Sequence, residues 1–181
     1  VAVIPKERFG ALADSFAKKA SESYDAAKLA AVPQGVLARA FEEAMKARDA
    51  AYAPYSKFQV GAALVVKDTK ERGGLKIVTG SNSENVVYQG TCAERNALAS
   101  AVVHGATGDG APESRIVTLV FTSNHDAVQV PCGACRQVIA ELAPTARILF
   151  GRDGRILREW AGIAALLPEA FDATWKKDAG S

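Results

Sequence analysis

Three cysteines, Cys92, Cys132 and Cys135, limit how this chain can fold more than any other feature. Cys132 and Cys135 follow Pro131, a residue favoured at a helix start, so both thiols should lie on one face of a first helical turn. Cys92 opens another helical segment, and Cβ atoms tilt towards a helix N-terminus, so Cys92 and Glu94 can both reach over that end. A fold that gathers the thiols must therefore point two helix N-termini at one place.

The chemistry of these thiols suits zinc. Thiolates are soft ligands, and helix dipoles stabilise their negative charge. With three cysteine ligands, the fourth position of a tetrahedral zinc stays open to water, which distinguishes a catalytic site from a closed structural one. For the CxxC pair alone, a redox pair or half of a structural zinc site is the alternative. His104 and His125 do not stand at a ligand spacing, and we expect them at a helix end and in a polar loop.

Two arginines stand beside these residues. Thiolates in excess of the zinc charge make a bound water a poorer acid, so a nearby cation is needed. Arg95 follows Glu94 and Arg136 follows Cys135, and either guanidinium could withdraw charge from a thiolate sulfur. The alternative, above all for Arg136, is an ordinary surface arginine in the middle of a helix.

The rest of the chain alternates between strand and helix patterns. We expect helices over 36–51, 92–104 and 132–142, a hairpin of strands 58–66 and 76–80, and strands over 116–121, 147–150 and 155–160. This order predicts an α/β fold with a single sheet of about five strands sandwiched by helices. Residues 1–33 should form an N-terminal helical extension, followed by a catalytic domain over 34–181.

Composition restricts the partners. Lys and Arg total 22 against 20 Asp and Glu, so the net charge of +2 gives no strong field for nucleic acid or an anionic membrane. Charged residues soon after Pro5 leave no room for the apolar region of a signal peptide, and no stretch approaches the roughly 18 apolar residues of a membrane span. We therefore expect a cytoplasmic protein with a small, nearly neutral substrate. In that reducing compartment, metal binding or catalysis is favoured over disulfides.

Four motifs together resemble the zinc-dependent, three-cysteine cytidine deaminases, which are usually homotetramers. They are Ala53-Pro54-Tyr55-Ser56-x-Phe58-x-Val60-Gly61-Ala62-Ala63, Asn82-x-Glu84-Asn85, Cys92-Ala93-Glu94-Arg95 and Pro131-Cys132-Gly133-Ala134-Cys135-Arg136-Gln137. The resemblance covers about residues 36–171 and implies a three-layer α/β/α fold with a mixed sheet. It also implies one Zn²⁺ per subunit and hydrolysis of cytidine, deoxycytidine or both to the uracil nucleoside and ammonia, as in pyrimidine salvage.

The resemblance implies roles for the substrate-binding residues. Asn82 and Glu84 would hold the ribose hydroxyls, for which an amide beside a carboxylate supplies neutral and charge-assisted partners. Taken alone, the pair could equally be a turn with a solvated charge. Phe58 would pack against the base, and the Ala93 N–H and Val130 carbonyl would meet the pyrimidine edge.

Two further aromatic residues are implied to act between subunits. Phe171 would reach the active site of a neighbouring subunit, with core packing or a frayed tail as the alternatives. Tyr88 would line a shared site. Between Asn85 and Cys92 the chain is one residue shorter than the family pattern, which leaves the alignment of Val86 and Tyr88 open.

We expect Glu94 to be the general acid and base, taking a proton from the zinc-activated water, delivering it to N3 and returning one to the departing amine. The nearest alternative is a deaminase for another cytosine compound such as blasticidin S, although Asn82-x-Glu84-Asn85 favours an ordinary nucleoside. A nucleic-acid deaminase should present stacking aromatics, and only 7% of the residues are aromatic. A zinc-stabilised interaction module would have no use for Glu94.

Overall fold

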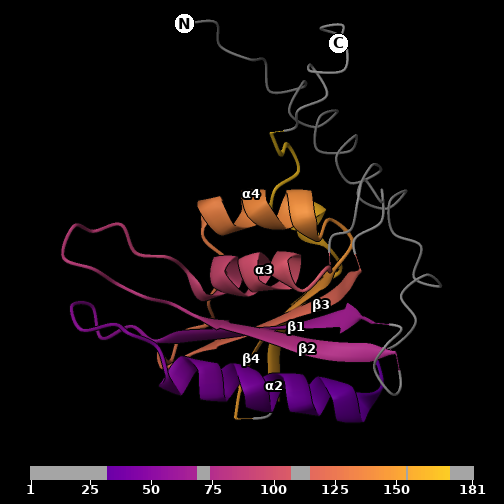
Figure 1. Ribbon diagram of the computed structural model, residues 1–181, viewed down its shortest axis with the longest axis horizontal. Coiled ribbons are helices and arrows are strands. Elements are labelled where there is room, and N and C mark those ends of the chain that lie inside the picture. The colour runs from indigo at the N-terminus through magenta and orange to yellow at the C-terminus, as the bar shows by residue number, and fades with distance from the viewer. Residues whose placement is uncertain (1–31, 69–73, 107–114, 154, 172–181) are drawn as a thin grey trace, which may run out of the picture. The chain divides into compact units, whose positions relative to one another are not determined.

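The computed structural model describes residues 32–68, 74–106, 115–153 and 155–171, and these form one sheet with helices on both faces (Figure 1). The strands run in the order β2-β1-β3-β4-β5. Their bounds are β1 Val60–Lys67, β2 Leu75–Ser81, β3 Ile116–Ser123, β4 Arg147–Arg152 and β5 Arg155–Trp160. β3 and β4 are parallel and the other neighbours antiparallel, so the sheet is mixed, as expected.

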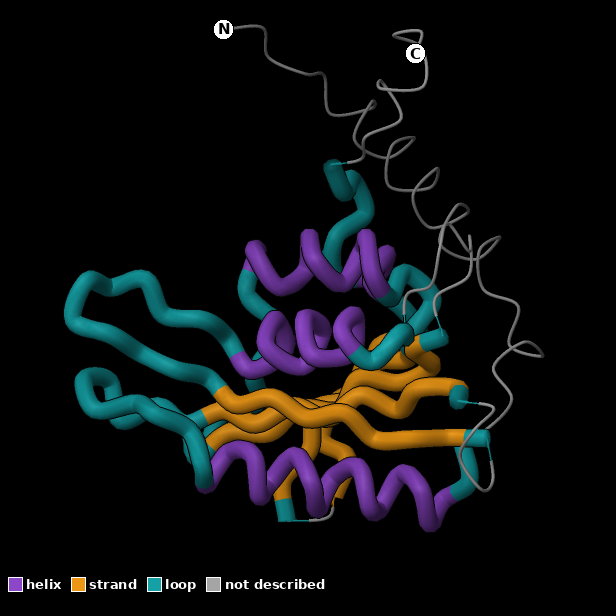
Figure 2. The backbone as a smooth tube through the Cα atoms, viewed as in Figure 1, coloured by secondary structure: helices purple, strands orange, loops and turns teal. Residues whose placement is uncertain are grey.

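The helices make two outer layers. α2 (Gln34–Asp49) covers one face of the sheet, while α3 (Ala93–Val103) and α4 (Gly133–Leu142) lie on the other (Figures 1 and 2). A short 3₁₀ helix, η1 (Ile163–Ala165), packs against α4. The expected three-layer architecture is therefore confirmed, whereas the helical extension expected before Val32 lies outside the described residues. None of the described helices is long and apolar enough to cross a membrane.

Strand β1 is buried on both faces, which explains its continuous apolar sequence. Ala62, Leu64 and Val66 belong to the core under α3 and α4. Ala63 and Val65 point the other way, into the core under α2. The alternation of a strand thus serves two cores at once.

Gly80 and Gly61 let helices approach the sheet closely on opposite faces. A Cβ atom on Gly80 would lie 2.6 Å from the Ala93 carbonyl oxygen and 2.3 Å from the Ala97 nitrogen, both in the first turns of α3. On Gly61 it would lie 1.9 Å from the Ala44 carbonyl oxygen in α2. The missing side chain at Gly80 therefore fixes how close the start of α3 lies to β2.

One strand begins later than the sequence predicts. The apolar run starts at Phe58, but β1 starts at Val60. The Phe58 N–H donates to Ser56 Oγ at 3.0 Å and its carbonyl accepts from Asn82 Nδ2 at 2.8 Å. Because side chains take up these backbone groups, Phe58 does not join the ladder of the sheet.

Candidate active site

The three thiols meet where α3 and α4 begin. Cys92 and Cys132 are the N-cap residues of the two helices, and their Sγ atoms lie 3.7 Å apart. The Sγ atoms of Cys132 and Cys135 lie 3.5 Å apart, and all three sulfurs lie within 4.8 Å of one another. Neither N-cap thiol caps its own helix, so both face the cluster. The convergence of two helix N-termini is as the sequence predicts.

The spacing of the sulfurs fits a tetrahedral zinc. A Zn–S bond of about 2.3 Å places two sulfurs of a regular tetrahedron about 3.8 Å apart. The observed Sγ–Sγ distances of 3.7 Å and 3.5 Å are close to that edge. The donor set is three thiols without a carboxylate, and such a set binds zinc in preference to magnesium or calcium.

The ionisation of the thiols also calls for a cation. Hydrogen bonds from Cys135 and Cys132, together with the Arg95 charge, lower the pKa of Cys92 to about 6 despite its partial burial. The hydrogen bond to Cys92 and burial raise the pKa of Cys135. The Cys92 thiolate thus forms readily, while Cys135 resists ionisation until positive charge is supplied.

Glu94 lies in the first turn of α3, beside this cluster. Its side chain is only 5% exposed. Burial raises the pKa of Glu94 to about 6, the charge of Cys92 adds to the effect, and hydrogen bonds from its own backbone N–H and from Cys135 oppose it. A carboxyl group that gains and loses a proton near neutral pH is suited to general acid and base chemistry.

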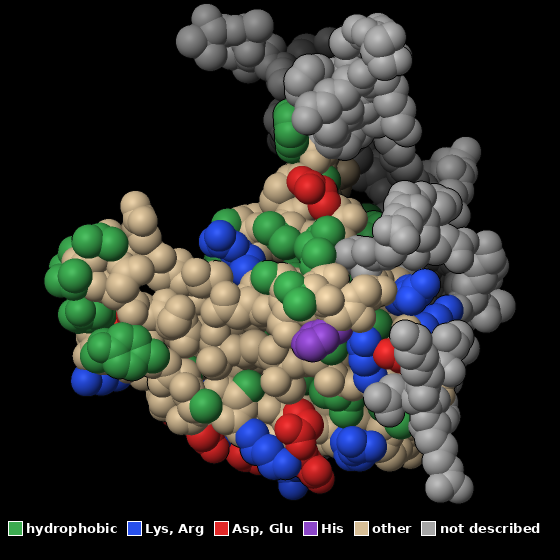
Figure 3. Space-filling view, in the orientation of Figure 1, with side chains coloured by type: hydrophobic (Ala, Val, Ile, Leu, Met, Phe, Trp, Pro, Cys, Tyr) green, Lys and Arg blue, Asp and Glu red, His purple; other side chains and the backbone are tan. Residues whose placement is uncertain are grey.

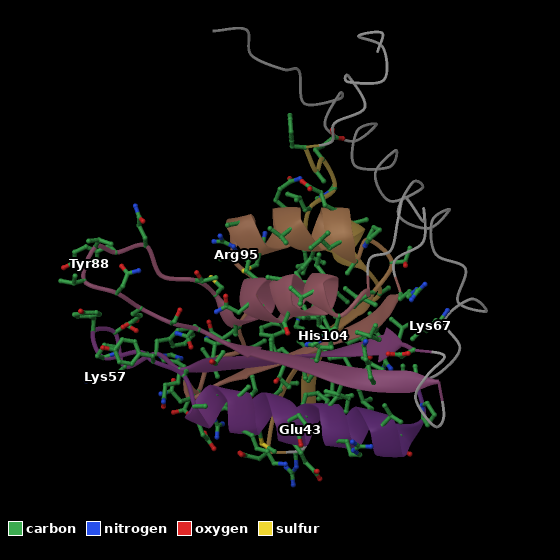
Figure 4. All side chains as sticks on the ribbon, viewed as in Figure 1. Glu43, Lys57, Lys67, Tyr88, Arg95 and His104 are labelled. Atoms are coloured by element: carbon green, nitrogen blue, oxygen red, sulfur yellow. The ribbon has the colours of Figure 1, made fainter. Side chains whose placement is uncertain are left out.

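The two arginines have different surroundings. Arg95 lies at the start of α3 (Figure 4), and its charge acts on Cys92. Arg136 donates from Nε to the Pro131 carbonyl at 2.7 Å and from Nη1 to the Leu166 carbonyl at 3.2 Å. These bonds to main-chain oxygens fix the start of α4, so the charge-balancing role of Arg136 stays a prediction without a thiol contact behind it.

Asn82 and Glu84, the residues predicted to hold ribose, both bind the loop before β1. Asn82 Oδ1 accepts from the Val60 N–H at 2.7 Å, while its Nδ2 donates to the Phe58 carbonyl. Glu84 Oε2 accepts from the N–H groups of Tyr55 and Ser56 at 2.9 Å and 3.1 Å. Each side chain keeps further hydrogen-bonding capacity, so contact with a sugar stays a prediction.

A hollow of about 440 Å³ lies next to Glu84. It is lined by Tyr55, Ser56, Glu84, Asn85, Tyr88 and Gly90. Tyr88 is 91% exposed, and it and Lys57 lie in two loops that project from the same end of the sheet (Figure 4). Figure 3 shows hydrophobic side chains gathered at this end of the molecule, where Val86 and Val87 are also exposed.

The three residues predicted to meet the base have different surroundings. Phe58 is half-buried, and its ring lies edge-on to His125, with centroids 6.2 Å apart. Ala93 is the first residue of α3, so its N–H has no acceptor within the helix. Val130, just before Pro131, is exposed.

Sequence analysis missed Asn124. Its Oδ1 accepts from the Gln59 N–H at 3.0 Å and its Nδ2 donates to the Lys57 carbonyl at 2.9 Å. Asn124 thus holds one side of the Phe58 segment, and Asn82 holds the other. The dipeptide Ser-Asn at the end of β2 recurs at the end of β3, and this repeat could have indicated that Asn124 acts like Asn82.

Gln137 is a second missed residue. Its Nε2 donates to the Phe171 carbonyl at 2.6 Å and its Oε1 accepts from the Phe171 N–H at 3.1 Å. The Phe171 side chain is 68% exposed, so within one chain it is not a core residue. The helix that carries two of the thiols therefore also holds the backbone of Phe171.

The chain is similar to known proteins in both sequence and fold. Residues 36–152 match the family model described as the cytidine and deoxycytidylate deaminase zinc-binding region. A cytidine deaminase of Halalkalibacterium halodurans is 40% identical over 134 residues, which cover 73% of this chain and 91% of the relative. A cytidine deaminase from Mycobacterium tuberculosis is 38% identical over 128 residues, which cover 71% of this chain and 84% of the relative. The crystal structure of cytidine deaminase from Burkholderia pseudomallei superposes with a TM-score of 0.61 at 38% identity, covering 74% of this chain and 97% of that one.

Proposed function

The chain belongs to the cytidine and deoxycytidylate deaminase family, and on this basis we propose that it hydrolyses cytidine, deoxycytidine or both to the uracil nucleoside and ammonia. The observation that carries the proposal is the cluster of three thiols within 4.8 Å beside the buried Glu94. A structural zinc site would need its fourth position closed, and the chain has no further cysteine to close it.

The site residues divide the chemistry between them. Cys92, Cys132 and Cys135 would hold the zinc ion, which would supply Lewis acidity and lower the pKa of the attacking water. Glu94 takes a proton from the attacking water and delivers it to N3 of the pyrimidine, which makes C4 electrophilic, and the hydroxide left behind adds to C4. Glu94 then takes the proton of the hydroxyl added at C4 and passes it to the amine, whose bond to C4 breaks, so water and cytidine give uridine and ammonia. Burial raises the pKa of Glu94 towards neutrality, which suits a group that both takes up and gives off a proton.

The substrate contacts follow the family pattern. Asn82 and Glu84 bind the sugar hydroxyls, and Phe58 packs against the base. The Ala93 N–H and the Val130 carbonyl contact the pyrimidine edge. Support comes from the hydrogen-bonding capacity left on Asn82 and Glu84 and from the free N–H at the start of α3.

Assembly completes the site in this proposal. We place a neighbouring subunit's Phe171 over the pocket and Tyr88 at its rim, in a homotetramer. A single chain leaves the consecutive residues Val86, Val87 and Tyr88 exposed, and large apolar side chains grouped on a surface mark an interaction site. Phe171, elsewhere in the fold, is also exposed. The three free thiols favour a reducing compartment, which supports a cytoplasmic enzyme of pyrimidine salvage.

The test is the loss of ultraviolet absorbance as purified, zinc-loaded protein converts cytidine to uridine. Deoxycytidine and blasticidin S run in parallel separate an ordinary nucleoside deaminase from one for a modified cytosine compound. Turnover of blasticidin S alone would move the substrate assignment to that alternative. No turnover of any of them by folded, zinc-loaded protein would favour a zinc-stabilised interaction module instead.

A further inference from the structure

Ser56 lies between the two residues assigned above to the sugar and the base. Its hydroxyl donates a hydrogen bond to Glu84 Oε1 and accepts one from the Phe58 N–H at 3.0 Å. Its own backbone N–H donates to Glu84 Oε2 at 3.1 Å. A single exposed serine therefore connects a carboxylate on the loop after β2 with the aromatic residue before β1.

The backbone next to Ser56 has an unusual conformation that permits this link. Lys57 has a φ of 59°, in the left-handed region that residues other than glycine seldom adopt. This conformation turns the chain between Ser56 and Phe58. Asn124 holds the Lys57 carbonyl at 2.9 Å. Strained residues of this kind persist only where surrounding contacts fix them, and they gather at functional sites.

The hydrogen bonds of Glu84 leave little choice in how its carboxylate points. Oε2 accepts from the N–H groups of Tyr55 and Ser56, and Oε1 accepts from the Ser56 hydroxyl. A carboxylate has about four lone-pair sites, so about one remains, on Oε1. The Ser56 hydrogen bond is also the main reason that the pKa of Glu84 lies below its ordinary value, and desolvation opposes it. Ser56 thus helps to fix the direction of the acceptor left over.

We propose that Ser56 is a positioning residue that holds the Glu84 carboxylate and the Phe58 backbone in one geometry, so that sugar and base are bound as a unit. The inference rests on the proposed function, in which Glu84 contacts the sugar and Phe58 the base. Ser56 acts through these two residues and not on the reacting atoms. Its loss should therefore weaken substrate binding without changing the chemical step.

The first experiment measures kcat and KM for cytidine with the holoenzyme and its Ser56→Ala and Ser56→Thr variants. Ser56→Ala should lower kcat/KM by about 10-fold, mostly through KM, because a hydrogen bond to a charged group is lost. Ser56→Thr keeps the hydroxyl and should restore most of the loss. Ser83→Ala, which removes a hydroxyl next to Glu84 in the sequence, is the matched control and should behave as the wild type. Zinc content should be unchanged in every variant.

A double-mutant cycle with Glu84→Ala separates positioning from general packing. Ser56→Ala should reduce kcat/KM much less in the Glu84→Ala background, since the carboxylate on which it acts is gone. The inference would be overturned if the fold-changes in kcat/KM of the two single variants multiplied to give that of the double variant. An unchanged KM in Ser56→Ala would also overturn it. If Ser56→Ala proves unstable, Ser56→Cys, which keeps the side-chain size but donates weakly, should show the same rise in KM. An inactive wild type would refute the proposed function instead.

Discussion

Cys92 and Cys132 occupy the same position, the N-cap, in two different helices, and their Sγ atoms lie 3.7 Å apart. A metal ion that binds both therefore joins the start of α3 to the start of α4. Because Gly80 fixes the distance between α3 and β2, the joined helix ends are also fixed relative to the sheet. Zinc binding and stability of the fold should be coupled through this junction.

Cys132→Ala should lose zinc and activity together, since two thiolates hold the metal less tightly than three. Zinc per chain, measured on protein purified without added metal, is the readout, and the melting temperature should fall with it. Ala134→Ser alters an exposed residue of the same helical turn and should keep its zinc. A zinc-replete Cys132→Ala protein would contradict the ligand assignment.

Glu94→Gln should keep the fold and the zinc but lose most turnover, by about 10² to 10⁴-fold, because the amide cannot transfer the proton. Steady-state kinetics with cytidine and a zinc assay on the same sample check this. Glu42→Gln, an exposed position on α2, serves as the control and should be fully active. Near-normal turnover in Glu94→Gln would remove the proposed mechanism.

The same substitution should stabilise the zinc-free protein at alkaline pH. The pKa of Glu94 is raised from 4.5 to about 6 by folding, so its ionisation disfavours the folded state as the pH rises from 4.5 through 6. That shift corresponds to about 2 kcal/mol of folding free energy, which the glutamine variant would not lose because its side chain stays neutral. The free energy of unfolding of both chelator-treated proteins can be measured in denaturant at pH 4 and pH 8. The Glu94→Gln variant should be more stable than the wild type only at pH 8. Equal differences at both pH values would mean that Glu94 does not titrate in this range.

Arg95→Gln should leave the protein folded but lower kcat/KM by about 10-fold, because the thiolates then keep more negative charge and the bound water is less acidic. The Cys92 pKa should rise for the same reason, and alkylation of the zinc-free protein across a pH series would report it. Arg155→Gln, an exposed position on β5, is the control. Unchanged activity and zinc affinity would make Arg95 an ordinary surface residue.

Local sequence pattern predicted the elements of the fold well, but not the contacts that build the loops around the site. The burial of β1 on both faces follows from its apolar run, and the two N-cap thiols follow from the motifs. The late start of β1 does not follow from local pattern, because it depends on hydrogen bonds to the side chains of Asn82 and Asn124. Asn124 lies 65 positions along the chain from Gln59, the residue whose N–H donates to it. Helical and strand periodicities report only on near neighbours, so hydrogen bonds formed by tertiary packing leave no periodic signal.

Phe171 gives the test of assembly. Gln137 holds its backbone from both sides, while the residue is 68% exposed and lies outside the core that the described residues form. If the ring closes a neighbouring subunit's pocket, Phe171→Ala should raise KM by about 10-fold or more, since a large apolar surface no longer excludes water. Gln137→Met, which has a similar size but cannot hold both backbone groups, should raise KM in the same direction while Phe171 is still present. Zinc content should stay constant in both variants, because neither residue is a ligand. Mass in solution and turnover should also be measured together through a dilution series. Activity should fall as the tetramer dissociates. A fully active monomer would leave Phe171 without a role in catalysis.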